Sequence, residues 1–513
     1  MGGDDVAVAE LLAALSVATD LGMGQEPEMA VRACLVATRL ARAAGLPGRD
    51  VADVYYCTLL QHLGCTAASH ETAVVFGDDL ASAPRAERTD DRRLREVLGL
   101  LAAAGSGSAT ARLRHLTRAL TTGRDAGEQI RRSVCEVGAQ LAERLHLGAG
   151  VCAGLHHALE SWDGRHGAVG LSGEDIALPA RFAVVARQAV IFDGLGGPAA
   201  ALAMVRRRAG GWFDPSVAAV FVRVGVDALR ATAAADVWAE VAAAEPEPRR
   251  RVPATHLDDV AAAFADMVDL KTPFTLGHSA GVAALAAGAA EALGLPAGEV
   301  ALLRRAGLLH DLGRVAVSNA VWERPGPLRT AEWERVRLHA YHSERILGRA
   351  ALLAPVARVA GRHHERLDGS GYHRGATGGE LGAEARLLAA ADVFQALTQE
   401  RPQRPALAPP RAAEALAAAA AAGTLDPDSV RAVVEAAGQR PPRTRSAWPA
   451  GLTDREVEVL RLVARGLSNR QVAAELVVSP RTAEHHVQHI YAKIGVSTRA
   501  GAALFAMEHG LVR

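Results

Sequence analysis

The chain has 513 residues, of which 50% are hydrophobic and only 4% aromatic, with 57 basic and 57 acidic side chains. A formal net charge of zero excludes a general electrostatic attraction to nucleic acid or membrane, so any nucleic-acid contact must come from a local patch. The length allows two to four domains, and a composition rich in alanine and leucine favours helix nearly throughout.

No uncharged apolar run reaches membrane-spanning length, and no basic-then-apolar leader opens the chain. These features predict a soluble cytoplasmic protein without a membrane partner. The cysteines are odd in number and never spaced as C-x-x-C, which predicts free thiols in a reducing compartment and argues against zinc-finger chemistry. All of them lie in the first third of the chain: Cys34, Cys57, Cys65, Cys135 and Cys152.

Two stretches have the composition of linkers. "EPEPRRRVP" at 245–253 and "QRPPRTRSAWPA" at 439–450 combine proline and charge without an apolar period. They predict three domains, at residues 1–245, 253–438 and 450–513.

The first domain contains weaker copies of passages that return in the second. "LLQHLG" at 59–64 matches "LLHDLG" at 308–313 with an offset of 249 residues, and the same offset places "GLP" at 45–47 on "GLP" at 294–296. After an insertion, "GLHHALESWDG" at 154–164 matches "GRHHERLDGSG" at 361–371. Motifs repeated at a constant offset predict two copies of one helical domain.

In the second domain, five separate segments place a histidine or an aspartate at an otherwise apolar position. Any one of them could be a satisfied core group, but an ionised carboxylate in such a helix is costly unless it is paired or bound to a metal. A shared metal centre explains all five at once, and imidazoles with carboxylates suit divalent iron, manganese or zinc. The segments contain His278, the pair His310 and Asp311, His339 with His342, the histidines of "GRHHERLDGSGYHRG" at 361–375, and Asp392.

These passages resemble the HD-GYP family of metal-dependent phosphohydrolases, whose known members degrade cyclic di-GMP. The resemblance covers nearly all of residues 266–430: Gly277-His278-Ser279 matches G-H-S, "HDLGR" matches H-D-x-G-K, "HHERLDGSGYH" matches H-H-E-x-x-D-G-x-G-Y-P, and "ADVFQALT" matches the closing motif. It gives His342 no role. The metal ligands that it implies are His278, His310, Asp311, His339, His363, His364 and Asp392.

The sequence departs from the family pattern at three positions. Arg314 replaces a lysine that contacts phosphate and donates a proton, and arginine cannot release its proton at working pH. His373 replaces the proline of G-Y-P, so we expect a freer loop. Phe274 occupies the place of a third-metal ligand, so we expect two divalent ions, iron or manganese. Asp311 and Arg314 are the expected catalytic residues, and Arg314 is also an expected substrate contact. Tyr372, Arg374 and Arg386 are the further expected substrate contacts, with support of the loop as the alternative role.

The first domain has lost most of the corresponding ligands. Aligned with the second, it has Met29 for His278, Gln61 for His310, His62 for Asp311, Arg132 for His339 and Arg187 for Asp392, while His156 and His157 remain. Guanidinium groups in ligand positions repel a divalent cation, so we expect no catalytic metal here. Two roles stay open, a pairing scaffold and a sensor whose cationic pocket holds an anion.

The last domain has the pattern of four short helices with clear start signals. Thr453, Ser468 and Ser479 are predicted N-caps, and Pro480 is at the first helical position of the third helix. A helix, a tight turn and an arginine- and histidine-rich helix suit the major groove of DNA, while a bundle for protein contacts is the alternative.

Over its full length this tail resembles the LuxR-type helix-turn-helix. The resemblance implies a recognition helix at 480–493 and binding as a dimer to paired half-sites of DNA. Glu484, His485 and Gln488 are expected to face base edges. The expected phosphate contacts are Asn469, Arg470, Arg481, Thr482, His489 and Lys493.

Together these features predict an all-α protein of two tandem HD-type helical domains followed by a four-helix LuxR-type domain. The predicted function is a one-component transcriptional regulator, a homodimer whose second domain hydrolyses a phosphodiester at a two-metal centre. Cyclic di-GMP is the expected substrate. One alternative is a transcription factor that binds the nucleotide without cleaving it, and another is a phosphohydrolase acting on a different nucleotide.

Overall fold

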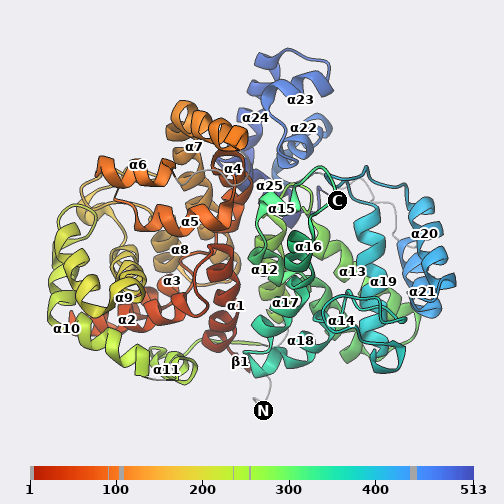
Figure 1. Cartoon of the computed structure of the whole chain (residues 1–513), viewed down its shortest axis with the longest axis horizontal. Coiled ribbons are helices and arrows are strands. Elements are labelled where there is room, and N and C mark those ends of the chain that lie inside the picture. The colour runs from red at the N-terminus through yellow and green to blue at the C-terminus, as the bar shows by residue number, and fades with distance from the viewer. Residues whose placement is uncertain are drawn as a thin grey trace. The chain divides into compact units, whose positions relative to one another are not determined.

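The computed structural model describes residues 5–90, 92–102, 109–234, 236–253, 256–438 and 448–512. They fall into two compact units, Met1–Leu257 and Asp258–Arg513 (Figure 1). The predicted all-α class is confirmed, because the only strands in the described residues are β1 (Asp5–Ala7) and β2 (Arg251–Pro253), which pair antiparallel.

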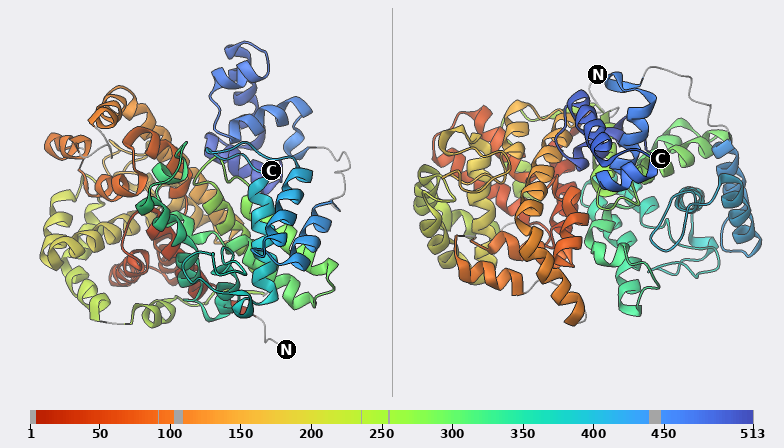
Figure 2. Two further views of the ribbon diagram at one scale, coloured as in Figure 1. Left: turned by 45° about the vertical axis from the view of Figure 1, so that its right-hand side comes forward. Right: turned by 90° about the horizontal axis from the view of Figure 1, so that it is seen from above.

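The first unit is built around α2, α3, α9 and α10, which pack on one another (Figure 1 and Figure 2). Its helices are α1 (Val8–Gly22), α2 (Met29–Ala43), α3 (Gly48–Leu59), α4 (Ser69–Phe76), α5 (Asp79–Arg88), α6 (Leu94–Ala102), α7 (Ala109–Arg144), α8 (Ala149–His156), α9 (Leu178–Arg208), α10 (Pro215–Ala234) and α11 (Val237–Ala244).

In the second unit, α13 packs against α14, α19 and α21. The helices of its HD-type part are α12 (Leu257–Asp269), α13 (His278–Ala292), α14 (Ala297–Leu309), α15 (Asn319–Trp322), α16 (Thr330–Arg337), α17 (His339–Leu347), α18 (Ala354–Ala360), α19 (Ala383–Leu397), α20 (Pro409–Ala421) and α21 (Pro427–Gly438). Four further helices complete the unit: α22 (Asp454–Ala464), α23 (Asn469–Glu475), α24 (Pro480–Ile494) and α25 (Arg499–Glu508).

The internal repeat predicted from the sequence is visible in the helices. The starts of α2 and α3 lie 249 residues before the starts of α13 and α14. The residue before α2 and the residue before α13 both have left-handed backbones, Glu28 at φ 74° and Gly277 at φ 70°. An aspartate holds the first turn of each helix, because Asp20 accepts the Ala30 N–H at 3.1 Å and Asp269 accepts the Ser279 N–H at 2.9 Å.

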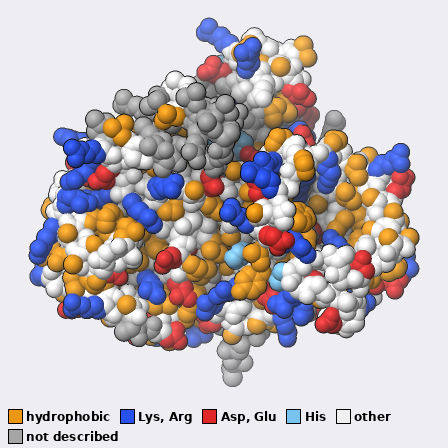
Figure 3. Space-filling model, viewed as in Figure 1, with side chains coloured by type: hydrophobic (Ala, Val, Ile, Leu, Met, Phe, Trp, Pro, Cys, Tyr) orange, Lys and Arg blue, Asp and Glu red, His pale blue; other side chains and the backbone are white. Residues whose placement is uncertain are grey.

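One described helix, α9, is long and apolar enough to cross a membrane by length and composition. Its residues Phe182, Val185 and Ala189 belong to the hydrophobic core of the first unit. The helix is also broken at Gly197, whose φ of 73° is not helical. Part of α9 therefore lies in that core, and length and composition by themselves are weak evidence for a membrane span. On the face drawn in Figure 3, basic and acidic side chains are interspersed with hydrophobic ones.

The start signals predicted for the last domain are confirmed. Thr453, Ser468 and Ser479 each accept a backbone N–H of the helix that follows, and Pro480 occupies the first turn of α24. Each cap satisfies an N–H that has no partner within its own helix.

We predict that α13 and α14 pack too closely at Gly307 to admit a methyl group. A Cβ at Gly307 would lie 2.5 Å from the Ala283 Cα, whereas a Cβ at Gly298, on the same helix, meets nothing within 4 Å. Gly307→Ala should therefore lower the free energy of unfolding by about 1–3 kcal/mol, and the control Gly298→Ala should leave it unchanged or raise it by up to about 1 kcal/mol. Urea denaturation followed by circular dichroism measures both, and equal midpoints would contradict the close packing.

Candidate metal centre

The seven predicted metal ligands come together in the second unit. His278 and His339 are the first residues of α13 and α17, His310 and Asp311 directly follow α14, His363 and His364 follow α18, and Asp392 lies within α19. Six of the side chains are buried and His364 is half-buried. Residues more than a hundred positions apart therefore form one cluster.

Asp311 lies at the middle of the cluster and divides it in two. Its Oδ1 is 3.2 Å from the Nε2 of His339 and 3.7 Å from the Nε2 of His363. Its Oδ2 is 3.4 Å from the Nε2 of His310 and 3.6 Å from the Nε2 of His278. This is the arrangement of a carboxylate that bridges two cations.

Asp392 completes the second half of the cluster. Its Oδ1 is 3.3 Å from the Nε2 of His278 and 3.8 Å from the Nε2 of His310, and its Oδ2 is 3.6 Å from the Nδ1 of His364. In the described residues, every group of three ligand atoms close enough to hold an ion is drawn from these seven side chains.

The far nitrogens of the imidazoles are held by fixed acceptors. The Nδ1 atoms of His310, His339 and His363 lie 2.8, 2.5 and 2.6 Å from the carbonyl oxygens of Gly307, Val336 and Ala360. The Nδ1 of His278 lies 2.9 Å from the Oε1 of Gln399. A carbonyl requires a proton on Nδ1, so the Nε2 lone pairs point into the cluster, as in metal-binding histidines.

The unpaired nitrogens are the sign that the cluster fits cations. The Nε2 of His310 and the Nδ1 of His364 are buried without a hydrogen-bond partner. The Nε2 atoms of His339 and His363 face each other at 3.1 Å, although the carbonyl contacts give both of them lone pairs. Two facing lone pairs repel each other unless a cation lies between them, so the donor set fits a divalent metal.

The electrostatics keep Asp311, His363 and His364 in the protonation states that metals require, whereas at His310 the effect of burial is outweighed by Asp311, which raises the pKa of this imidazole to about 9. Burial opposes ionisation of Asp311, but His310 and Arg314 hold the pKa of this carboxyl well below its usual range. Burial lowers the pKa of His363 to about 4 and shifts the pKa of His364 in the same direction. A carboxylate and neutral imidazoles are the ligand forms of these side chains.

A cleft of about 410 Å³ opens onto the cluster, and two arginines line it. Arg314 donates from Nη1 to the Oδ2 of Asp311 at 2.9 Å, and its guanidinium carbon is 4.1 Å from the ring centre of Trp322. The Nη2 of Arg401 lies 3.4 Å from the Nδ1 of His278. The sequence did not single out Arg401, because nothing in "QERPQRP" distinguishes it from Arg404. The cleft also contains Phe274, Trp322, Trp333 and Tyr372.

Two of the expected substrate contacts, Arg374 and Arg386, lie outside the cleft. Arg374 pairs with the Oε2 of Glu344 at 2.6 Å, and Arg386 donates from Nε to the carbonyl of Leu381 at 2.9 Å. Neither of them lines the cleft, and His342 does not line it either. Tyr372 does, and its ring centre is 4.2 Å from that of His364.

The loop that contains His373 is held in place without the proline of G-Y-P. Glu365 accepts the N–H groups of Arg374 at 3.1 Å and Ala376 at 2.9 Å. Arg337 donates to the carbonyls of Gly371 and Tyr372 at 2.9 and 3.1 Å. Side-chain hydrogen bonds therefore hold the backbone that proline would have fixed, and the freer loop stays a prediction.

The first unit lacks a comparable set of ligands among its described residues. The Nε2 of Gln61 is 3.9 Å from the Sδ of Met29. The counterparts of His310 and His278 are therefore in contact, but neither side chain is charged. His62 lies 3.7 Å from the Oδ1 of Asp20 and 3.3 Å from the Oε1 of Glu87. Arg187 pairs with the same Oε1 at 3.7 Å, so an acid from α5 occupies the cationic pocket.

The remaining equivalents in the first unit have other roles. The His157 Nδ1 accepts the Ala177 N–H at 3.0 Å, and neither His156 nor His157 lines the pocket. Arg132 is the wrong counterpart of His339, because its side chain is 55% exposed and pairs with Glu128. Its neighbour Arg131 lines the pocket instead.

Most of the expected DNA contacts lie on the exposed face of α24. Arg481, Thr482, Glu484, His485, Gln488 and His489 are exposed there, and Arg470 is exposed on α23. Four of the nine have side-chain partners within the domain. The Asn469 Oδ1 accepts from Arg499 at 2.7 Å, the Thr482 hydroxyl lies 2.7 Å from that of Ser479, and His489 and Lys493 lie 2.9 and 2.8 Å from Glu456. Burial opposes ionisation of Glu456, but Lys493, Thr453 and His489 lower its pKa to about 2.

Comparison with known proteins agrees with both resemblances. Residues 262–429 match the family model of the HD domain, and residues 450–506 match that of bacterial regulatory proteins of the luxR family. A 3′3′-cGAMP-specific phosphodiesterase of Vibrio cholerae is 32% identical over 405 residues, 78% of this chain and 88% of that protein. A cyclic di-GMP phosphodiesterase of Pseudomonas aeruginosa is 38% identical over 183 residues, 35% of this chain and 44% of that protein.

A solved structure is similar across both units. The crystal structure of a cyclic GMP-AMP-specific phosphodiesterase of V. cholerae has a TM-score of 0.59 and 28% identity, and the match covers 85% of this chain and 99% of that chain. The likeness therefore includes the first unit, which the HD-domain model does not match.

We predict that Asp311→Ala removes both expected metal ions, whereas His339→Ala removes one, because Asp311 presents one oxygen to the histidines of each half of the cluster. Elemental analysis of purified protein measures the metal content. His342→Ala is the matched control, since this histidine lies on the same helix as His339 but outside the cleft, and it should keep both ions. Equal metal content in all three variants would contradict the assignment.

Proposed function

The chain belongs to the HD-GYP family of metal-dependent phosphohydrolases, and from that premise we propose that its second unit cleaves a phosphodiester bond of a cyclic dinucleotide. The observation that carries the proposal is the convergence of seven ligand side chains on the two oxygens of Asp311. The proposed ligands are His278, His310, Asp311, His339, His363, His364 and Asp392. Two divalent ions, iron or manganese, would supply an acidified water and neutralise charge on the phosphate.

The cleft residues suit the rest of such a substrate. Arg314 and Arg401 place two guanidinium groups beside the cluster, where they would bind the non-bridging phosphate oxygens. Burial and the neighbouring Arg314 lower the pKa of Arg401 to about 10, which leaves it charged at neutral pH. Trp322, Trp333 and Tyr372 offer ring faces on which bases stack.

Among cyclic dinucleotides, 3′3′-cGAMP is the first candidate. The relative that matches most of both units is named for that specificity, whereas the cyclic di-GMP phosphodiesterase matches about a third of the chain. Cyclic di-GMP, the substrate expected from the sequence, is the second candidate.

One contact favours a rival function, a sensor that binds the nucleotide without cleaving it. Arg314 cannot pass a proton to the leaving oxygen, and its hydrogen bond to Asp311 competes with a metal for the same oxygen. The full set of ligands supports the enzyme. In either case we propose a cytoplasmic homodimer whose LuxR-type domain binds DNA, so that nucleotide occupancy controls transcription.

We predict that manganese- or iron-loaded protein converts 3′3′-cGAMP to a linear dinucleotide faster than it converts cyclic di-GMP. Asp311→Ala should lower kcat/KM by roughly a thousandfold or more, as expected for a group on which the whole cluster depends. Chromatography of the products measures turnover, and His342→Ala serves as the active control. Tight binding of both nucleotides without product would establish the sensor instead.

We predict that the DNA contacts depend on α23 and α24. Deleting residues 450–513 should abolish binding to duplex DNA, and Arg470→Ala should weaken it while reducing the dependence of log K on log salt by about one. Arg455→Ala is the control, because Arg455 lies on α22 and pairs with Glu458 at 2.6 Å. Fluorescence anisotropy at several salt concentrations gives the slopes, and an unchanged slope in Arg470→Ala would exclude this arginine as a phosphate contact.

A further inference from the structure

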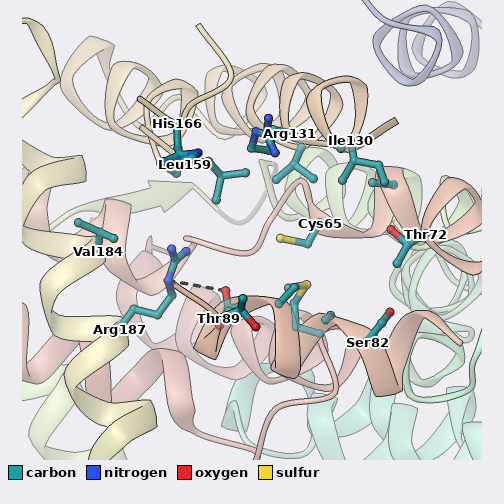
Figure 4. Close-up of a pocket in the computed structure, with 18 of the residues that line it drawn as sticks. Cys65, Thr72, Ser82, Thr89, Ile130, Arg131, Leu159, His166, Val184 and Arg187 are labelled. Carbon is teal, nitrogen blue, oxygen red and sulfur yellow. Dashed lines mark ion pairs between the residues drawn. The ribbon is translucent and has the colours of Figure 1, made fainter. Parts of the chain in front are cut away.

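The first unit contains a cavity of about 390 Å³ beside the lost ligand positions. Its lining comes from α4 and α5 on one side and from α7 and α9 on others (Figure 4). A volume of this size is within the range of small-molecule sites. The cavity lies within one unit and takes no residue from the other.

Most of the wall is apolar. Phe76, Ile130, Val134, Leu159 and Val184 are among the residues that line it. Small polar groups, the hydroxyls of Thr72, Ser82 and Thr89, interrupt this surface, and Figure 4 shows Ser82 and Thr89 at its lower side and Thr72 at its right. A wall of this kind favours a ligand with a compact apolar body and provides little for the many hydrogen-bonding groups of a nucleotide.

The acids in the lining have used their accepting capacity. Glu160 accepts the N–H groups of four consecutive residues, from Ala168 to Leu171, at 2.6 to 3.0 Å. Glu87 is engaged by His62, by Arg187 and by the Gln25 amide at 3.0 Å. Asp79 has partners of its own.

The arginines, in contrast, have donors left over. Arg187 is 6% exposed and lines the cavity, and its Nε forms an ion pair with Glu87 at 3.7 Å, but the guanidinium donates no hydrogen bond to the described residues. Toward the described residues Arg131 donates a single hydrogen bond, from its Nε to the carbonyl of Gly167 at 3.0 Å. In Figure 4 the two guanidinium groups come from opposite walls of the cavity. The unused groups are therefore cationic donors, which recognise an anion.

We propose that this cavity is a binding site for an amphipathic organic acid, with its carboxylate between Arg131 and Arg187 and its apolar body against α4 and α7. The same divergence that removed the metal ligands left a guanidinium at the position of Asp392. The first unit then responds to a small metabolite, and the second to a nucleotide.

The experiment uses the full chain and two fluorescent probes of the same shape. 8-Anilinonaphthalene-1-sulfonate is an anion with an apolar body, and N-phenyl-1-naphthylamine is its neutral counterpart. The anionic probe should bind at one site, decanoate should displace it, and decanamide should not. Thr72→Trp, which fills the cavity, should remove the binding of both probes and so identifies the signal that belongs to the cavity.

The variants test the two arginines. Arg131→Gln and Arg187→Gln should each weaken the anionic probe about tenfold or more and change the neutral probe less than about twofold. Arg132→Gln is the matched control, since Arg132 makes a similar backbone contact, to Ala168 at 3.3 Å, but does not line the cavity. If Arg187→Gln fails to fold, which circular dichroism will show, Arg131→Gln decides alone.

Three results would overturn the proposal. The first is equal binding of the anionic probe by Arg131→Gln, Arg132→Gln and the unmodified chain. The second is a Thr72→Trp variant that still binds both probes. The third is displacement of the probe by cyclic dinucleotides but not by decanoate, which would make the cavity a nucleotide site.

Discussion

The second unit depends on one buried carboxylate. Asp311 has four imidazole nitrogens within 3.7 Å, two at each oxygen, and a guanidinium on one of them. An acid that is 2% exposed is costly to ionise unless cations surround it. Here the cation beside the acid is the guanidinium of Arg314, and in the proposed enzyme two metals add to it. Two helices, α13 and α17, begin at the cluster and two, α14 and α18, end beside it, so the packing of these four helices fixes the groups that surround the carboxylate.

The first unit lacks the buried aspartate, so its helices need not surround a carboxylate with cations at that position. In the first unit the place of the aspartate is taken by His62, and the place of another acid by Arg187, so the sign of the charge is reversed. The structure compensates with Glu87 from α5, which pairs with both. In the first unit an acid is paired with cationic side chains at the place where the second unit has acids that suit a cation, while α2 and α3 keep their spacing of 249 residues from α13 and α14. Scaffold and site have therefore diverged independently.

Arg314 is the residue at which the chemistry of the second unit differs most from its family. Lysine occurs only at Lys271 and Lys493, so a bias toward arginine accounts for the replacement in the sequence. The structure gives the arginine contacts that suit a planar guanidinium, a face on Trp322 and a hydrogen bond to Asp311. These contacts orient it for a phosphate and do not restore a proton donor.

The sequence by itself determined the helical class, the repeat, the start signals of the last domain and the identity of the seven ligand candidates. These features can be predicted from the sequence because they depend on the spacing of motifs, on N-cap residues, and on polar residues at positions that are otherwise apolar. Only the tertiary structure decided which side chains share a space. It placed Arg401 beside the cluster and paired Arg374 and Arg386 with groups outside the cleft. In the first unit it directed Arg131, and not Arg132, into the cavity. Position along the chain does not fix the direction of a long side chain, and the packing of neighbouring helices does.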